Sequence, residues 1–142
     1  YLAGLLEPSA KLISWAIEVY GRYAGTIDLR ALPVDEGAGD LGYVTHPAFR
    51  GRGVMSQAVR LVVGHAFDTL GWQTVRWQAH VGNWGSAKAV WRAGFPMPTF
   101  VPDLLVERGR IVDGWISTMR ADATREPGVP WDEVRAALSS SA

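Results

Sequence analysis

The sequence contains no cysteine, and this absence excludes several kinds of chemistry. Without a thiol the chain has no disulfide, no thiolate nucleophile and no cysteine-ligated zinc. Catalysis, if present, must use oxygen, nitrogen or backbone groups, and an acetyl-cysteine intermediate is excluded. A chain without disulfides also fits a reducing compartment. Because the chain has neither a membrane-spanning stretch nor a start that resembles a signal peptide, we expect a cytoplasmic protein.

The sequence also lacks an excess of either charge and any long apolar segment. Fourteen basic and fourteen acidic residues give a formal net charge of zero, and neither sign forms a long run. We therefore expect no nucleic-acid partner and no membrane partner. No stretch approaches the roughly 20 apolar residues that span a bilayer. An anionic ligand would have to be held by local groups.

The length of 142 residues, 48% of them hydrophobic, predicts one domain over residues 1–142. The chain begins at Tyr1, with neither Met nor a recognisable processed start. We therefore expect it to be a fragment of a longer protein, truncated at its N-terminus.

The spacing of apolar residues predicts alternating strands and helices. A two-residue period from Leu12 to Tyr20 predicts a strand, and the Gly21-Arg22 pair predicts a hairpin turn into a second strand at 24–32. A three- and four-residue period after Gly53 predicts a helix that reaches Leu70. The other expected elements are strands at 40–45, 74–81, 104–108 and 111–120, and helices at 84–93 and 130–138. This order predicts an α/β sandwich with a mixed sheet.

A glycine-rich turn, Phe49-Arg50-Gly51-Arg52-Gly53-Val54-Met55, joins the strand at 40–45 to the first helix. Its two glycines allow a tight turn and close approach to a ligand, and the free N–H groups of the following helical turn favour an anion such as a diphosphate. Arg50 and Arg52 could add charge-assisted hydrogen bonds. The alternative is a turn that uses glycine only for its backbone freedom.

Two common nucleotide-binding motifs are not supported at this turn. The Rossmann fingerprint needs a third glycine where Ser56 stands, and an acidic residue at the end of the next strand, where none is found. The P-loop needs a terminal Gly-Lys-Ser/Thr, which is also missing.

The turn resembles the acetyl-CoA signature of the GNAT superfamily, Q/R-x-x-G-x-G/A, with Arg50 and Gly53 in the first and fourth places. Met55 departs from the small sixth residue. The chain is also similar to the RimJ/RimL-type branch in three further segments, in the same order. These are Gly42-Tyr43-Val44, Ala66-Phe67 with Leu70-Gly71, and Asn83-Trp84-Gly85-Ser86 with Ala93-Gly94-Phe95. The resemblance spans about half the chain, from Gly39 to Phe95.

The resemblance implies a GNAT-like mixed, mostly antiparallel sheet with helices on both faces, here without the family's N-terminal strand–helix region. The strand at 12–20 would then be an exposed edge with unpaired backbone groups. We expect a second copy of the chain, as a homodimer, or a missing upstream segment to cover it. A third alternative folds residues 1–10 back as a helix on the sheet.

The resemblance implies acetyl-CoA as a cosubstrate and no metal. The pantetheine arm would pair with the backbone of Val44 and Thr45, in a gap between the strands at 40–45 and 74–81. The amides from Gly51 to Ser56 would hold the pyrophosphate. Asn83 would lie near the pantetheine, although a plain helix N-cap fits this position equally well. The implied cofactor-binding residues are Val44, Thr45, Arg50, Gly51, Arg52, Gly53, Val54, Met55, Ser56 and Asn83.

The resemblance also implies N-acetylation of a primary amine, on a protein N-terminus or a small molecule, by direct attack on the thioester. The ammonium must first lose a proton to a base. Asp40 stands where the family often has glutamate and is the first candidate, followed by Glu18 and His46. Ser86 matches the family's N-x-x-S serine and could stabilise or protonate the thiolate. The competing interpretations are that Asp40 is a solvated carboxylate at the start of a strand and that Ser86 caps a helix.

A second function stays open beside catalysis, namely a non-catalytic acyl-CoA-binding module that regulates a larger protein. The amine acceptor cannot be identified from the sequence, because the loops that would select it lie in the segments that match the branch least. Trp84 and Trp115 could line an acceptor cleft, but packing explains them equally well.

Overall fold

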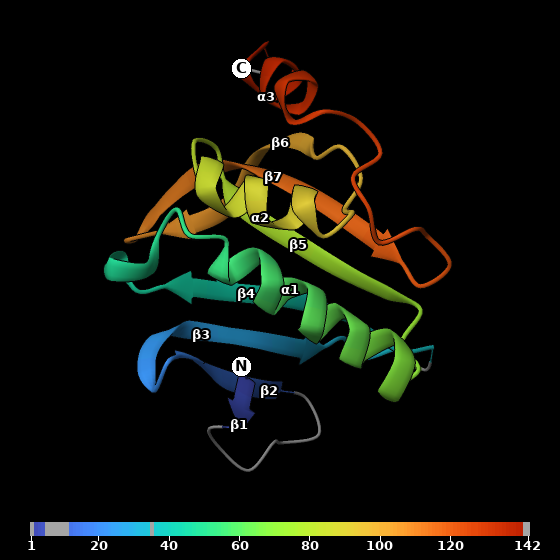
Figure 1. The fold of residues 1–142 in the computed structure, drawn as a ribbon. Helices are drawn as coiled ribbons and strands as arrows, with labels where there is room; N and C mark the ends of the chain where they lie inside the picture. Colours follow the sequence, from blue (N-terminus) through green and yellow to red (C-terminus); the bar gives the residue numbers. More distant parts are fainter. Residues whose placement is uncertain (1, 5–11, 35, 141–142) are drawn as a thin grey trace.

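The computed structural model describes residues 2–4, 12–34 and 36–140, which form one twisted sheet covered by helices (Figure 1). Seven strands occur within these residues, in the order β1-β2-β3-β4-β5-β7-β6. They are β1 (Leu2–Gly4), β2 (Leu12–Val19), β3 (Arg22–Ala31), β4 (Ala38–Thr45), β5 (Thr74–His80), β6 (Thr99–Glu107) and β7 (Arg110–Arg120). Only β4 and β5 pair in parallel. The predicted mixed, mostly antiparallel sheet is therefore confirmed.

The hairpin turn between β2 and β3 lies one residue earlier than the sequence predicted. Val19 pairs with Arg22, so Tyr20 and Gly21 are the central residues of the turn. Both have positive φ angles, 51° and 78°. A two-residue turn of this kind needs positive φ at both positions to match the twist of the strands. Glycine supplies the second position, while Tyr20 takes the first with its side chain fully exposed.

The helices are α1 (Val54–Gly64), which continues into the π-helical turn η2 (His65–Thr69), α2 (Trp84–Arg92) and α3 (Trp131–Ser140). α1 is the crossover between β4 and β5. Its buried side chains, Met55, Ala58, Val59, Val62 and Val63, pack on the sheet. Asn83 caps α2 through its side chain, as predicted, and Gly71 ends the first helical segment with a φ of 72°.

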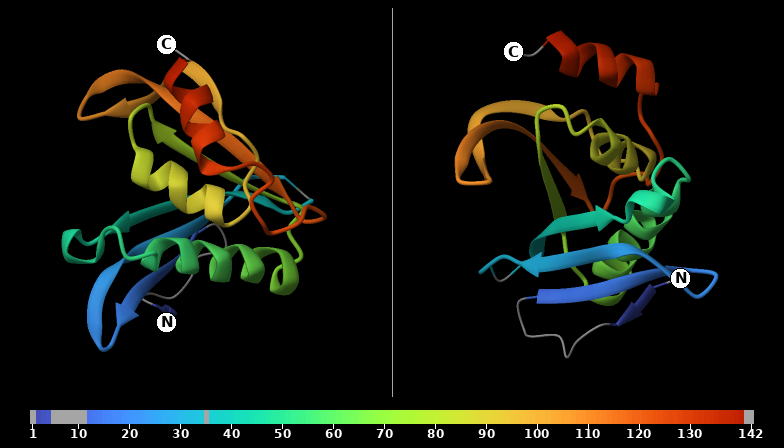
Figure 2. Two further views of the ribbon diagram at one scale, coloured as in Figure 1. Left: turned by 45° about the horizontal axis from the view of Figure 1, so that its top comes forward. Right: turned by 90° about the vertical axis from the view of Figure 1, so that its left-hand side faces the viewer.

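α1 and α2 pack on the same face of the sheet (Figure 2), and α3 packs against α2. The alternation along β5 gives the reason. Val75, Trp77 and Ala79 are buried under the helices, whereas Arg76, Gln78 and His80 point to the opposite face. That face presents polar groups at these positions and offers little apolar surface for a helix to cover.

The β2 edge is partly covered by the chain's own N-terminus, an outcome that none of the sequence alternatives included. Leu2 pairs with Ile17 and Gly4 with Trp15, so β1 is a short antiparallel strand beside β2. A helix is therefore wrong for residues 2–4, and residues 5–11 lie outside the described part. Coverage of the remaining edge by a second copy or an upstream segment stays a prediction. No helix within the described ranges is long and apolar enough to cross a membrane.

The segment after β7 crosses back over the helices before it forms α3. Arg125 binds Asp68 of η2 through two hydrogen bonds of 2.9 and 2.8 Å, and the Trp91 indole donates to the Val129 carbonyl at 2.7 Å. Trp131 then packs against Trp91, with ring centroids 5.6 Å apart. These contacts fix α3 against α2.

We predict that Gly94→Ala destabilises the fold. Gly94 has a φ of 97°, and a Cβ there would lie 2.7 Å from the backbone carbon of Arg125. We expect a loss of at least roughly 1–3 kcal/mol in urea unfolding, the usual cost of a strained backbone position. Gly64→Ala is the matched control. Gly64 has an ordinary helical φ of −58° and space for a methyl group, so this variant should gain about 0.5–1 kcal/mol. Equal stabilities for the two variants would contradict this packing.

Candidate functional site

β4 and β5 pair at one end and separate at the other. Their parallel register runs from Ala38 and Thr74 to Leu41 and Trp77, and no further pair between them occurs in the described residues. β4 stays paired with β3 as far as Thr45, and β5 with β7 as far as His80. The facing backbone edges beyond Leu41 and Trp77 are thus open to a ligand that pairs like a strand. The predicted gap is confirmed.

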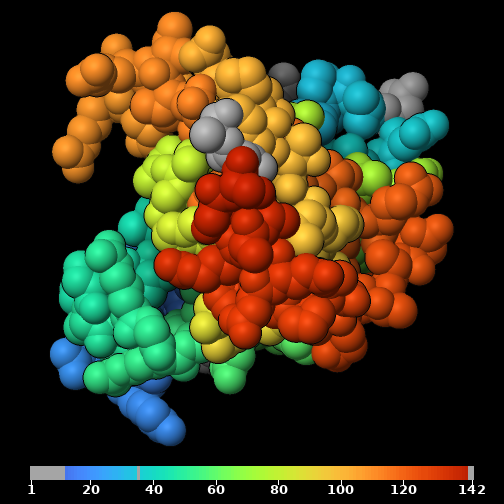
Figure 3. Space-filling view, turned by 90° about the horizontal axis from the view of Figure 1, so that it is seen from above, coloured from blue at the N-terminus to red at the C-terminus, as the bar shows by residue number. Residues whose placement is uncertain are grey.

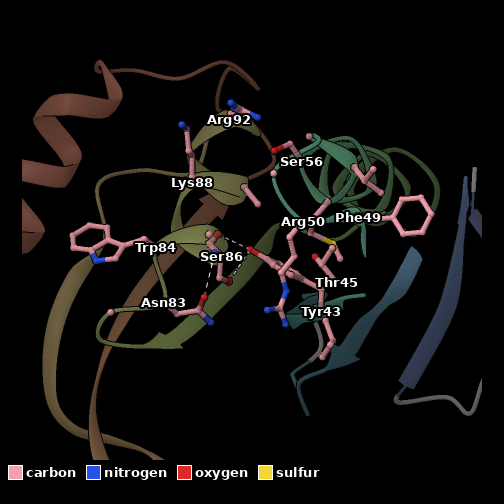
Figure 4. A pocket seen from close by; sticks show the side chains of 18 of the residues that line it. Tyr43, Thr45, Phe49, Arg50, Ser56, Asn83, Trp84, Ser86, Lys88 and Arg92 are labelled. Atoms are coloured by element: carbon pink, nitrogen blue, oxygen red, sulfur yellow. Dashed lines mark hydrogen bonds between the residues drawn. The ribbon is translucent and has the colours of Figure 1, made fainter. Parts of the chain in front are cut away.

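A cavity of about 710 Å³ opens at this gap, between β4, the glycine-rich turn and the first turns of α1 and α2 (Figure 4). The volume lies within the range of about 300–1,000 Å³ that is usual for small-molecule sites. Nine of the ten predicted cofactor-binding residues line it: Val44, Thr45, Arg50, Gly51, Gly53, Val54, Met55, Ser56 and Asn83. Arg52 does not line it, and its guanidinium lies over the Phe49 ring, 5.6 Å from the centroid.

The glycine-rich turn delivers uncapped helix amides to the cavity. Gly51 and Gly53 both have positive φ, 77° and 72°, and no side chain caps the start of α1. The N–H groups of a first helical turn have no acceptor within the helix and carry partial positive charge. The Met55 side chain is buried in the core, so the side chain at the sixth signature position does not fill the site. The turn is therefore suited to bind an anion.

Three cations line the same cavity, and two of them were missed by the sequence analysis. Arg50 was predicted, while Lys88 and Arg92 lie one turn apart on α2 and face the cavity from the other side (Figure 4). No Asp or Glu is among the lining residues that the structure describes. Arg92 also approaches the turn, since its Nη1 lies 3.7 Å from where a Cβ on Gly53 would be. A neutral chain thus carries a locally cationic pocket.

Ser86 joins the two separated strands through α2. Its hydroxyl accepts a hydrogen bond from Trp77 Nε1 at 3.0 Å and donates to Tyr43 Oη at 3.0 Å. Tyr43 Oη in turn donates to the Ser86 carbonyl at 2.7 Å (Figure 4). Burial raises the pKa of Tyr43 above its ordinary value, so this phenol stays protonated. Ser86 lines the cavity, but its proton is already directed at Tyr43.

Asp40 lies outside the cavity lining, in an ion pair with Arg76. The guanidinium Nε and Nη2 contact the two carboxylate oxygens at 2.6 and 3.1 Å. The carboxylate raises the pKa of Arg76 through these bonds. Glu18 and His46 do not line the cavity either, and the His46 ring accepts a hydrogen bond from the Ala48 amide at 3.1 Å. The structure thus brings none of the three expected bases into the cavity.

The two tryptophans considered for an acceptor cleft have different positions. Trp115 is fully buried, with its ring centroid 4.9 Å from that of Trp84. Trp84 lines the cavity and lies under the guanidinium of Arg135, 4.5 Å away. Packing therefore accounts for Trp115, while Trp84 forms part of the cavity wall.

Comparison with known proteins gives a family match over most of the chain. A family model described as an acetyltransferase (GNAT) domain matches residues 4–96. No curated protein sequence matches the chain. Among solved structures, a probable acetyltransferase is 26% identical with a TM-score of 0.71, and the match covers 78% of this chain and 63% of that one.

Two further solved structures share the fold at lower identity. RimJ of Mycobacterium smegmatis, solved with CoA-disulfide, is 17% identical with a TM-score of 0.73, over 79% of this chain and 54% of RimJ. A variant of spermidine N-acetyltransferase SpeG from Vibrio cholerae is 13% identical with a TM-score of 0.70, over 79% of this chain and 67% of SpeG. The chain thus spans between about half and two thirds of these proteins.

We predict that Ser86→Ala lowers stability as well as any activity. The substitution leaves the buried indole N–H of Trp77 without its acceptor, which should cost about 1–3 kcal/mol in chemical unfolding. Ser139→Ala removes only an exposed bond to the Arg135 carbonyl within α3 and should change stability by less than about 0.5 kcal/mol. If Ser86→Ala were as stable as Ser139→Ala, Ser86 would not hold the separated strands.

Proposed function

We propose that this chain, which belongs to the GNAT acetyltransferase family, binds acetyl-CoA in the cavity between β4, α1 and α2 and transfers its acetyl group to a primary amine. One observation carries this proposal. The separated parallel strands lead directly to uncapped helix amides, inside a cavity that is lined by cations and by no described carboxylate.

The phosphate end of the cofactor fits the glycine-rich turn. The amides of Val54, Met55 and Ser56 are the free donors, and Arg50 and Arg92 supply positive charge beside them. Charge-assisted hydrogen bonds to phosphate are roughly twice as strong as neutral ones. In our proposal this local charge allows a neutral protein to hold a strongly anionic cosubstrate.

The pantetheine arm fits the gap between β4 and β5. An extended arm can pair with the open backbone edge of β4 at Thr45, as an added strand would, whereas the backbone groups of Val44 point toward Thr26 of β3. The side chain of Asn83 already accepts from the Ser86 amide at 3.3 Å, and its NH₂ group remains as a donor. This placement directs the thioester into the gap between β4 and β5.

The proposed reaction joins a neutral amine to the acetyl carbonyl carbon. The C–N bond forms, the C–S bond breaks, and the electron pair leaves on sulfur. Backbone N–H groups at the open strand edge are available to polarise the carbonyl oxygen. Neither spermidine nor a protein N-terminus is favoured over the other by the described residues.

One observation favours the alternative of a non-catalytic acyl-CoA-binding module. Asp40 and Ser86, the two catalytic residues expected from the sequence, are both engaged, one by Arg76 and the other by Trp77 and Tyr43. Release of free CoA thiol in the presence of primary amines separates the two functions. Steady turnover supports the transferase, and tight binding without turnover supports the module.

We predict that Gly53→Asp prevents cofactor binding. The new carboxylate would stand at the start of α1, where the pyrophosphate is proposed to bind, and would repel it. We expect acetyl-CoA affinity measured by calorimetry to fall at least about 100-fold, equal to about 2.7 kcal/mol. Gly21→Asp is the matched control, because Gly21 also has positive φ and open space but lies in the β2–β3 turn. Parent-like affinity in Gly53→Asp would show that the cofactor binds elsewhere.

A further inference from the structure

Histidine is a common general base, and the described lining of the cofactor cavity contains one, His80. The titratable residues among the described lining are Tyr43, Arg50, His80, Lys88 and Arg92. Arginine stays protonated in proteins, and lysine ordinarily does so near pH 7. The phenol of Tyr43 is held as a donor to the Ser86 carbonyl. By elimination, a base that touches the cavity must be His80 or water.

The position of His80 fits this role. It is the last residue of β5, three residues beyond the last parallel pair, Leu41 and Trp77. Val44 lies three residues beyond the same pair on β4, so the register sets His80 and Val44 opposite each other across the gap. The proposed pantetheine path therefore passes His80.

The hydrogen bond of His80 fixes which ring nitrogen can act. Its Nδ1 lies 3.0 Å from the Val81 carbonyl oxygen. A carbonyl oxygen can only accept, so Nδ1 carries the proton in this bond. In the neutral ring Nε2 is then unprotonated, with a lone pair available for a proton from substrate.

A second cavity, of about 430 Å³, is also lined by His80. It is lined by His80, Val81, Glu107, Arg108, Val112 and Asp113, from the end of β5 and the turn region of the β6–β7 hairpin. His80 is the one residue shared by the described linings of the two cavities. The surface is recessed between this hairpin and the glycine-rich turn (Figure 3). The second cavity carries two carboxylates where the first carries none.

We infer that the acceptor amine enters through the second cavity, past Glu107 and Asp113, and gives its proton to Nε2 of His80. This inference rests on the proposed function. The ammonium passes one proton to Nε2, and the neutral nitrogen then forms the C–N bond as the C–S bond breaks. A second proton moves from nitrogen to the thiolate, which gives the amide and the CoA thiol. Protonated His80 then releases its proton to solvent.

The charged groups around His80 divide between the two cavities. Arg50, Lys88 and Arg92 line the cofactor cavity and attract an anionic cosubstrate. Glu107 and Asp113 line the second cavity and attract a cationic amine, while Arg108 offsets them in part. The two substrates are thus attracted to two cavities that share His80.

The test is His80→Gln, assayed with acetyl-CoA and primary amines. We expect kcat/KM to fall about 10²–10⁴-fold, and the acidic limb of its pH profile to disappear, because the general base is lost. Acetyl-CoA affinity measured by calorimetry should match the parent, which also shows that the variant folds. His65→Gln, in η2 against Trp15, is the control and should keep both the rate and the acidic limb.

Different results would contradict this inference and the proposed function. A His80→Gln variant with the parent's kcat/KM and pH profile would overturn the inference and leave the transferase intact. A parent that binds acetyl-CoA but acetylates no amine would overturn both.

A second variant tests the entry path without changing His80. Glu107→Gln with Asp113→Asn should raise KM for the amine and leave kcat unchanged, and the new amide oxygen can still accept from the Asp103 amide. Asp122→Asn with Glu133→Gln is the control pair, since both carboxylates are exposed and line neither cavity. An unchanged KM in the first pair would overturn entry through the second cavity.

Discussion

The separation of β4 and β5 beyond Leu41 and Trp77 is the constraint on which the rest of the site depends. Two parallel neighbours that stop pairing leave backbone groups without partners, which is costly unless something else holds the strands or binds the edges. Here the side chains of Tyr43 and Trp77 meet at Ser86, so α2 bridges the two strands where their backbones no longer do. This bridge supports the gap at its closed end and leaves the rest open to a ligand.

Charged side chains are unevenly distributed around this gap. The formal net charge is zero, yet the cavity at the gap is lined by Arg50, Lys88 and Arg92 and by no described carboxylate. At physiological ionic strength charges act over about 8 Å, so local composition matters more than net charge for a bound ligand. The second cavity, in contrast, is lined by two carboxylates, those of Glu107 and Asp113. In our proposal, an anionic cosubstrate and a cationic acceptor can each approach a surface of opposite sign.

Features set by neighbouring residues could be predicted from the sequence, and features set by the packing of distant elements could not. The order of strands and helices from β2 onward, the glycine-rich turn and the Asn83 cap depend on local pattern, and each was found. The turn between β2 and β3 was predicted one residue too late. Glycine suits either central position of a two-residue hairpin turn, so Gly21 alone does not show which of the two it occupies. The ion pair of Asp40 needs β5 beside β4, which no local pattern reveals.

The same distinction explains the residues that were missed at the site. Lys88 and Arg92 form a four-residue basic spacing on a predicted helix, but whether that side faces solvent or the glycine-rich turn depends on how α2 packs against α1. His80 lines both cavities, and this depends on where the β6–β7 hairpin lies.

Amide hydrogen exchange followed by NMR, with and without CoA, tests the central claim most directly. The account predicts that CoA slows exchange at Thr45 on the open edge of β4, and at Val54 to Ser56 in the first turn of α1, because these amides become donors to the ligand. The outer strands β1 and β2 should be unaffected. Tight CoA binding that leaves exchange at both of these segments unchanged would contradict the account, because the cofactor would then occupy neither the gap nor the turn.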